Sequence, residues 1–69
     1  MPIYLAEAYR EYPIVQITGD DKLKRHLENL GFFVGEPITL VNRVDDNVIV
    51  KIKGVSLAIS RELAKRILV

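Results

Sequence analysis

The most regular pattern in the chain is a leucine stripe that predicts a helix over about residues 21–30. The leucines recur at i, i+4 and i+7. This spacing puts three of them on one side of the helix: Leu23, Leu27 and Leu30. Asp20 stands just before this stretch, where its carboxylate can accept a hydrogen bond from the first turn as an N-cap. The pattern therefore predicts one amphipathic helix with a defined start.

The residues after this helix predict an abrupt reversal. Gly31 occupies the position at which a left-handed residue ends a helix, because a residue without a Cβ adopts that conformation without a clash. If the C-cap is the residue before Gly31, Phe32 falls where a Schellman motif makes an apolar contact with Leu27. Gly35 permits a second sharp turn, and Pro37 then stands near the start of a new strand.

β-branched residues and alternating polarity predict about five short strands. In chain order they are Ile14–Thr18, Ile38–Val44, Val48–Lys53, Ser56–Ile59 and Ile67–Val69. In the second and third strands, alternate residues are expected to point toward the core. They are Ile38, Leu40, Val44, Val48, Val50 and Ile52. Asp45–Asn47 and Gly54–Val55 have the composition of tight connections between strands.

The remaining segments complete a small barrel. Residues 2–13 predict an extended lead-in with one short helical turn. Ser60 can cap a short helix from Arg61 to about Arg66. The expected fold is a single domain over residues 1–69, mainly β, with one helix inserted after the first strand and a short C-terminal helix. Closure suits short strands because it removes exposed edges, and an apolar edge left open would permit homo-oligomers.

Composition excludes several classes of function. The 69 residues carry a net charge of +1, which gives no electrostatic case for a nucleic-acid or anionic-membrane partner. Nearby acids offset the basic side chains Lys22, Lys24, Arg25, Lys51 and Lys53. The absence of cysteine favours an intracellular protein, and Met1–Glu7 lacks the pattern of a signal peptide. No apolar stretch approaches the roughly 20 residues that span a bilayer.

Candidate catalytic and metal-binding residues are few. His26 is the sole histidine, stands among charged residues and is expected to face solvent, so no metal site and no cofactor are expected. The carboxylate pairs at Asp20–Asp21 and Asp45–Asp46 lie at a helix start and a turn, where aspartate is common for structural reasons. We therefore expect no enzymatic activity.

Aromatic side chains are the better candidates for function. Phe32 is expected in the core, whereas Phe33 stands beside a tight turn and is a candidate contact anchor for a partner protein, although it could equally fold back over the barrel. Tyr9 and Tyr12 are the other candidate partner-binding residues.

With these segments placed, the chain resembles the FeoA family, the small cytoplasmic proteins of bacterial ferrous iron uptake. The ordered set of matching positions is Leu23, Leu27, Leu30–Phe32, Gly35, Ile38–Val41, Val48–Gly54, Leu57–Ile59, Leu63–Ala64 and Ile67–Val69. Two positions depart from the family pattern: Val34 stands where proline is common, and Tyr9–Tyr12 replaces a segment that often has glycine. We expect the first loop to differ in shape accordingly.

The resemblance implies an SH3-like barrel without catalytic activity. It also implies a cytoplasmic accessory protein whose partner is the G-protein domain of the FeoB-type ferrous transporter. An alternative function stays open at this point, because related SH3-like domains occur fused to metal-dependent repressors. In that case the chain would be a peptide-binding or regulatory module.

Overall fold

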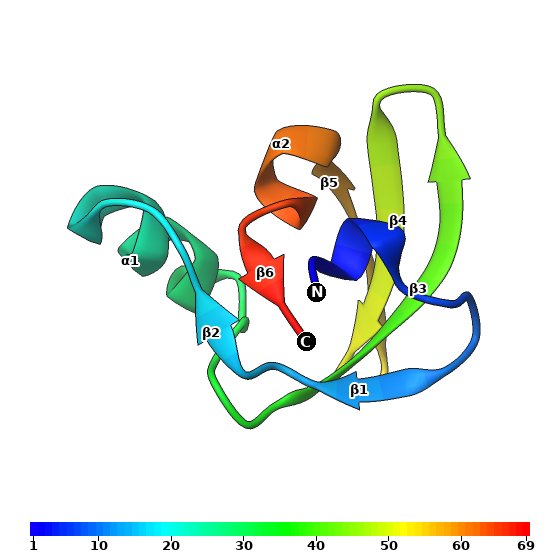
Figure 1. Ribbon diagram of the computed structural model, residues 1–69, viewed down its shortest axis with the longest axis horizontal. Helices are drawn as coiled ribbons and strands as arrows, with labels where there is room; N and C mark the ends of the chain where they lie inside the picture. The colour runs from blue at the N-terminus through cyan, green and yellow to red at the C-terminus, as the bar shows by residue number, and fades with distance from the viewer.

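Two antiparallel sheets form the frame of the protein (Figure 1). The computed structural model describes residues 1–69. The larger sheet has the order β1-β3-β4-β5, with bounds Glu11–Pro13, Pro37–Val44, Asn47–Ile52 and Val55–Ser60. The smaller sheet pairs β2 with β6, Gln16–Ile17 and Ile67–Leu68. The mainly β architecture is confirmed, with six strands where about five were expected.

Three short helices complete the chain, and the two termini lie close together (Figure 1). They are the 3-10 turn η1, Ile3–Leu5, and the α-helices α1, Asp21–Asn29, and α2, Arg61–Ala64. The single helical turn expected in the lead-in is therefore present. The Ser60 hydroxyl accepts a hydrogen bond from the Leu63 N–H at 3.2 Å, which confirms the predicted cap of α2. The helix itself is shorter than predicted.

The predicted first strand is divided between the two sheets. Instead of a single strand over Ile14–Thr18, β1 pairs with β3 before this stretch, and only Gln16 and Ile17 pair with β6. Ile14 is the crossing point, since its N–H donates to the Glu36 carbonyl and its carbonyl accepts from the Gly35 N–H, at 3.0 and 2.7 Å. The chain changes sheets here, so β1 and β2 are short.

The reversal after α1 has the predicted Schellman geometry. The Phe32 N–H donates to the Leu27 carbonyl at 3.0 Å, and the Gly31 N–H donates to the Glu28 carbonyl at 2.9 Å. Gly31 has φ +100°, a conformation that L-residues rarely adopt. Of the predicted apolar stripe, Leu27 is fully buried, Leu23 is half-buried and Leu30 is 39% exposed, whereas Phe32 is fully buried. The reversal brings Phe32 back next to Leu27, so Phe32 rather than Leu30 fills the core beside that leucine.

A β-bulge in β3 changes which residues face the core beyond Leu40. Leu40 pairs with Val50, but Asn42 pairs with Ile49, so one extra residue lies in β3. Val44 was expected to point inward and is exposed instead, because the extra residue exchanges the two faces of the strand.

Because of the bulge, the side chain of Arg43 is directed toward the lead-in. Its Nε donates to the Tyr4 carbonyl at 2.8 Å and its Nη2 donates to the Ala6 carbonyl at 2.9 Å. These two charge-assisted hydrogen bonds hold η1 against β3, and η1 in turn buries Ile3. The lead-in is thereby fixed over one end of the barrel.

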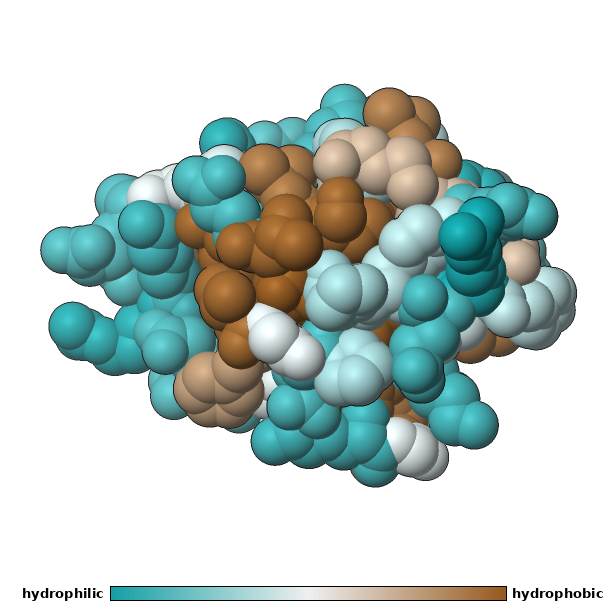
Figure 2. Space-filling model, turned by 60° about the horizontal axis from the view of Figure 1, so that its bottom comes forward, coloured by the Kyte–Doolittle hydropathy of each residue, from teal (hydrophilic) through white to brown (hydrophobic).

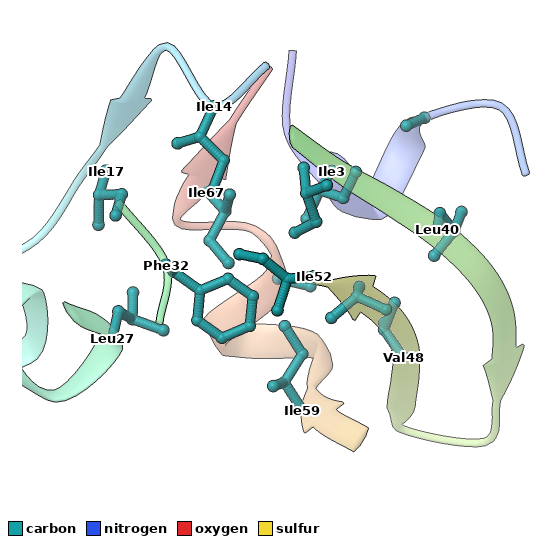
Figure 3. Packing of buried hydrophobic residues seen from close by; sticks show 14 residues of the cluster. Ile3, Ile14, Ile17, Leu27, Phe32, Leu40, Val48, Ile52, Ile59 and Ile67 are labelled. Atoms are coloured by element: carbon teal, nitrogen blue, oxygen red, sulfur yellow. The ribbon is translucent and has the colours of Figure 1, made fainter. Parts of the chain in front are cut away.

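The interior is entirely apolar (Figure 3). The 14 buried side chains come from nearly every element: Ile3, Ala6, Ile14, Ile17, Leu27, Phe32, Ile38, Leu40, Val48, Val50, Ile52, Ile59, Ala64 and Ile67. No polar or charged residue is buried. The polar and charged side chains therefore all reach the surface.

Replacing Gly31 tests the importance of the reversal. No atom lies within 4 Å of a Cβ built on Gly31, so the cost of Gly31→Ala is backbone strain alone. We expect a loss of about 1–2 kcal/mol in the free energy of unfolding, measured by urea denaturation, and a smaller loss for Gly31→Asn. An unchanged midpoint for Gly31→Ala would contradict this role.

The two adjacent phenylalanines provide a matched pair for the core. Phe32→Ala should lower the free energy of unfolding by about 3–5 kcal/mol, because it empties a fully buried site. Phe33→Ala should cost about 1 kcal/mol or less, because that ring is 43% exposed. Thermal unfolding followed by circular dichroism distinguishes the two, and equal losses would show that the assignment of core and surface is wrong.

Candidate functional site

Phe33 lies on the surface beside an apolar groove. The groove has a volume of about 530 Å³ and is lined by Val15, Gln16, Ile17, Lys24, Glu28, Phe32, Phe33 and Val34. We call it the Phe33 groove. It is formed where β2, α1 and the reversal after α1 meet. Figure 2 shows one face of the molecule, on which an apolar area is bordered by hydrophilic side chains.

The position of Phe33 follows from the reversal that buries Phe32. The residue after the buried ring opens a turn, since the Glu36 N–H donates to the Phe33 carbonyl at 3.0 Å, and its side chain is exposed. The ammonium of Lys53 lies 5.5 Å from the centroid of the Phe33 ring, within the range of a cation–π interaction. Phe33 thus presents an aromatic face with a neighbouring positive charge.

Tyr9 lies at a second, more polar groove. This groove of about 590 Å³ runs over the outer face of the larger sheet and is lined by Tyr9, Glu11, Glu36, Pro37, Thr39, Val41, Lys51, Lys53, Gly54 and Ser56. Tyr9 is 78% exposed and has φ +63°, and its N–H donates to the Leu40 carbonyl at 2.8 Å. The backbone of Tyr9 is therefore fixed while its ring is free.

Tyr12 has a different environment from the other two aromatic residues. It is half-buried and packs against the core. Its hydroxyl accepts a weak hydrogen bond from the Glu7 N–H at 3.4 Å, and the Arg10 guanidinium lies 5.5 Å from its ring centroid. The structure thus places Phe33 and Tyr9 in separate grooves, and Tyr12 lines neither. Lys53 lines the Tyr9 groove and also contacts Phe33.

Val15 and Val34 are surface residues that were not expected among the partner contacts. Both are exposed and both line the Phe33 groove. Val34 lies in a turn, and both it and the preceding Phe33 are exposed. For Val15 the signal available was the doublet Ile14–Val15, since two adjacent apolar residues in an extended segment cannot both face the core. Which member faces solvent depends on the crossing at Ile14, which is a tertiary feature.

The candidate histidine and the candidate aspartates lie on the surface of the fold. His26 is exposed on α1, and the Asp20 carboxylate accepts a hydrogen bond from the Leu23 N–H at 2.8 Å, as the N-cap prediction required. No group of three or more histidine, cysteine, aspartate or glutamate side chains gathers in a way that could hold a metal ion. The basic side chains that nearby acids were expected to offset lie in different places, since Lys24 lines the Phe33 groove and Lys51 the Tyr9 groove.

Arg61 connects α2 to the turn between β3 and β4. Its N–H donates to the Asp46 carbonyl at 2.8 Å, and its Nη2 lies 3.6 Å from Asp46 Oδ1. The Tyr4 hydroxyl, and to a lesser extent Asp46, raise the pKa of Arg61 above its ordinary value. Asp46 therefore has a partner in the fold, consistent with a structural role for this turn.

Solved structures with the same fold include several FeoA proteins. A crystal structure of an iron uptake regulatory protein, FeoA, has a TM-score of 0.87 at 24% identity, covering 97% of this chain and 91% of that one. The zinc complex of Stenotrophomonas maltophilia FeoA, described as an SH3 domain protein, has a TM-score of 0.82 at 20% identity, covering 99% and 87%. These similarities establish the expected SH3-like fold.

A manganese-dependent transcriptional repressor shares the fold more distantly. It has a TM-score of 0.86 at 13% identity, covering 97% of this chain but 39% of the repressor. A comparison with curated protein sequences finds no match. No helix in the structure is both long enough and apolar enough to cross a membrane.

The family model that matches the sequence covers the whole described chain. It is the FeoA domain, matched over residues 1–69. The Schellman reversal, the order of the strands and the capped C-terminal helix agree with the resemblance seen in the sequence. The chain belongs to the FeoA domain family.

Proposed function

We propose that this protein is a non-enzymatic accessory of ferrous iron uptake. Its partner is the cytoplasmic G-protein domain of a FeoB-type transporter, to which it binds from the cytoplasm. The observation that carries the proposal is the FeoA domain match over all 69 residues. The Stenotrophomonas maltophilia relative, described as a candidate activating factor of ferrous iron transport, supports the same role.

The chemistry of the surface supports a docking function. Every fully buried side chain is apolar, and both grooves lie at the surface, which supports recognition at the surface. The Phe33 groove instead presents exposed apolar side chains next to charged ones, Lys24 and Glu28. An aromatic anchor surrounded by polar residues is the arrangement that contributes most to binding at protein interfaces.

Phe33 is the first of the proposed partner contacts and Tyr9 the second. Phe33 combines an exposed ring with a groove that can receive an apolar side chain. Tyr9 offers a free ring on a fixed backbone. Tyr12 contributes less, because its ring already packs against the core. A regulatory module for a metal-dependent repressor has the support of a shared fold alone.

Binding to the transporter domain can be measured directly. Calorimetric titration of the G-protein domain, in the nucleotide-free, GDP-bound and GTP-analogue-bound states, should give a complex in at least one state. Phe33→Ala should weaken that complex about tenfold or more, as expected for an aromatic anchor. Val44→Ala removes part of an exposed side chain on β3, outside both grooves, and should bind like the unmodified protein.

The outcomes separate the function from the site. Absence of a complex in every nucleotide state would overturn the proposed function. A complex that Phe33→Ala and Val44→Ala affect equally would retain the function and reject the Phe33 groove as its contact surface. Tyr9→Ala and Tyr12→Ala then rank the two tyrosines by the same titration.

A further inference from the structure

The outer edge of β5 has unused backbone groups. β5 is the last strand of the larger sheet and pairs on one side only, with β4. The two strands are joined by the two-residue turn Lys53–Gly54, which makes Ile52 and Val55 a hydrogen-bonded pair. In an antiparallel ladder such pairs alternate, so the N–H and C=O groups of Ser56 and Ala58 point away from β4.

Both residues are exposed, and nothing else in the fold pairs with them. None of the backbone hydrogen bonds outside the regular elements involves Ser56 or Ala58. Each therefore offers one donor and one acceptor to solvent. A second strand that lies beside β5 would find these four groups already in the geometry of a sheet.

The other strand ends are protected against such pairing. β1 has three residues, including Pro13 and a charged Glu11, and β2 and β6 have two residues each. β5 has six residues, none of them charged and none of them proline, and its register with β4 is uninterrupted. β3 also pairs with β4 alone beyond Thr39, but its bulge and the charged Arg43 protect that edge. The edge of β5 lacks the usual protection.

The side chains of β5 allow a close approach. On the outer face it has small residues, Ser56, Ala58 and Ser60, which leave room beside the edge. On the core-facing side, Val55 is 54% exposed and Leu57 is half-buried, although their cross-strand partners Ile52 and Val50 are buried. The apolar surface at this edge thus remains incompletely covered.

We propose that β5 pairs antiparallel with β5 of a second copy of this chain. The pairing has a two-fold axis at Leu57, so that Leu57 lies opposite its counterpart and Ser56 lies opposite Ala58 of the second copy. The two larger sheets then join into one. The arrangement uses the free backbone groups of Ser56 and Ala58 and covers Leu57 and Val55.

Two properties favour a second copy over an unrelated extended segment. β5 is already held as a strand by β4, so two such edges pair without the loss of conformational freedom that a flexible peptide suffers. The net charge is +1 and β5 itself is uncharged, so two copies approach without strong repulsion. This inference does not depend on the transporter as partner.

Sedimentation equilibrium of the full chain tests the proposal. Between about 10 μM and 1 mM the weight-average mass should rise from monomer toward dimer, as expected for a small interface. Ala58→Lys should weaken the dimer about tenfold or more, because it places two like charges at the shared edge. Ala8→Lys makes the same chemical change at an exposed residue of the lead-in, and its mass curve should match the unmodified chain.

Amide hydrogen exchange identifies the edge independently of any variant. The amides of Ser56 and Ala58 should become protected as concentration rises, while the amide of Leu57, already directed to β4, should not change. A chain that stays monomeric up to about 1 mM would overturn the proposal and leave the edge for a strand of another protein. A dimer that Ala58→Lys and Ala8→Lys affect equally, or without new protection at Ser56 and Ala58, would overturn it as well.

Discussion

The contact between Leu27 and Phe32 is the constraint on which the rest of the structure depends. Four residues lie between the two positions, and a Schellman reversal at Gly31 is required to bring the aromatic ring back against the helix. Once Phe32 is buried, the chain direction is fixed and β3 begins at Pro37 in register with β1. One local turn thus attaches α1 to the barrel and starts its largest sheet.

The same turn determines what the surface displays. Because Phe32 points inward, Phe33 and Val34 are left outside, next to β2 and α1, where they line a groove with Val15. Burial of one aromatic ring and exposure of the next are therefore a single structural event. The function proposed for Phe33 follows from the packing of its neighbour, in a protein whose buried side chains are all apolar.

Local signals in the sequence predicted the elements that depend on local physics. The caps at Asp20 and Ser60 and the glycine at position 31 act through neighbouring residues, and all three are present as expected. Features that depend on contacts between distant parts of the chain could not be predicted from local sequence signals. The bulge in β3 exposes Val44 and presents Arg43 to carbonyls of the lead-in, which lies nearly 40 residues earlier in the sequence.

The candidate site was likewise predictable only where local sequence signals determine it. Phe33 could be named as a candidate because it stands beside a tight turn, but only the structure shows that it is exposed and does not fold back over the barrel. Val15 could not, because its exposure results from the crossing of the chain between sheets at Ile14. The division of the aromatic candidates between two grooves likewise requires the paired strands, since Tyr9 is held by Leu40.

Chemical-shift mapping of the isotope-labelled chain, titrated with the unlabelled G-protein domain of its FeoB-type transporter, tests the account most directly. The account predicts that the largest changes gather at Val15, Phe33 and Val34, while the buried Leu27 and Phe32 keep their environment. Changes confined to residues outside the Phe33 groove, or a loss of the Phe32 core signals on binding, would contradict it.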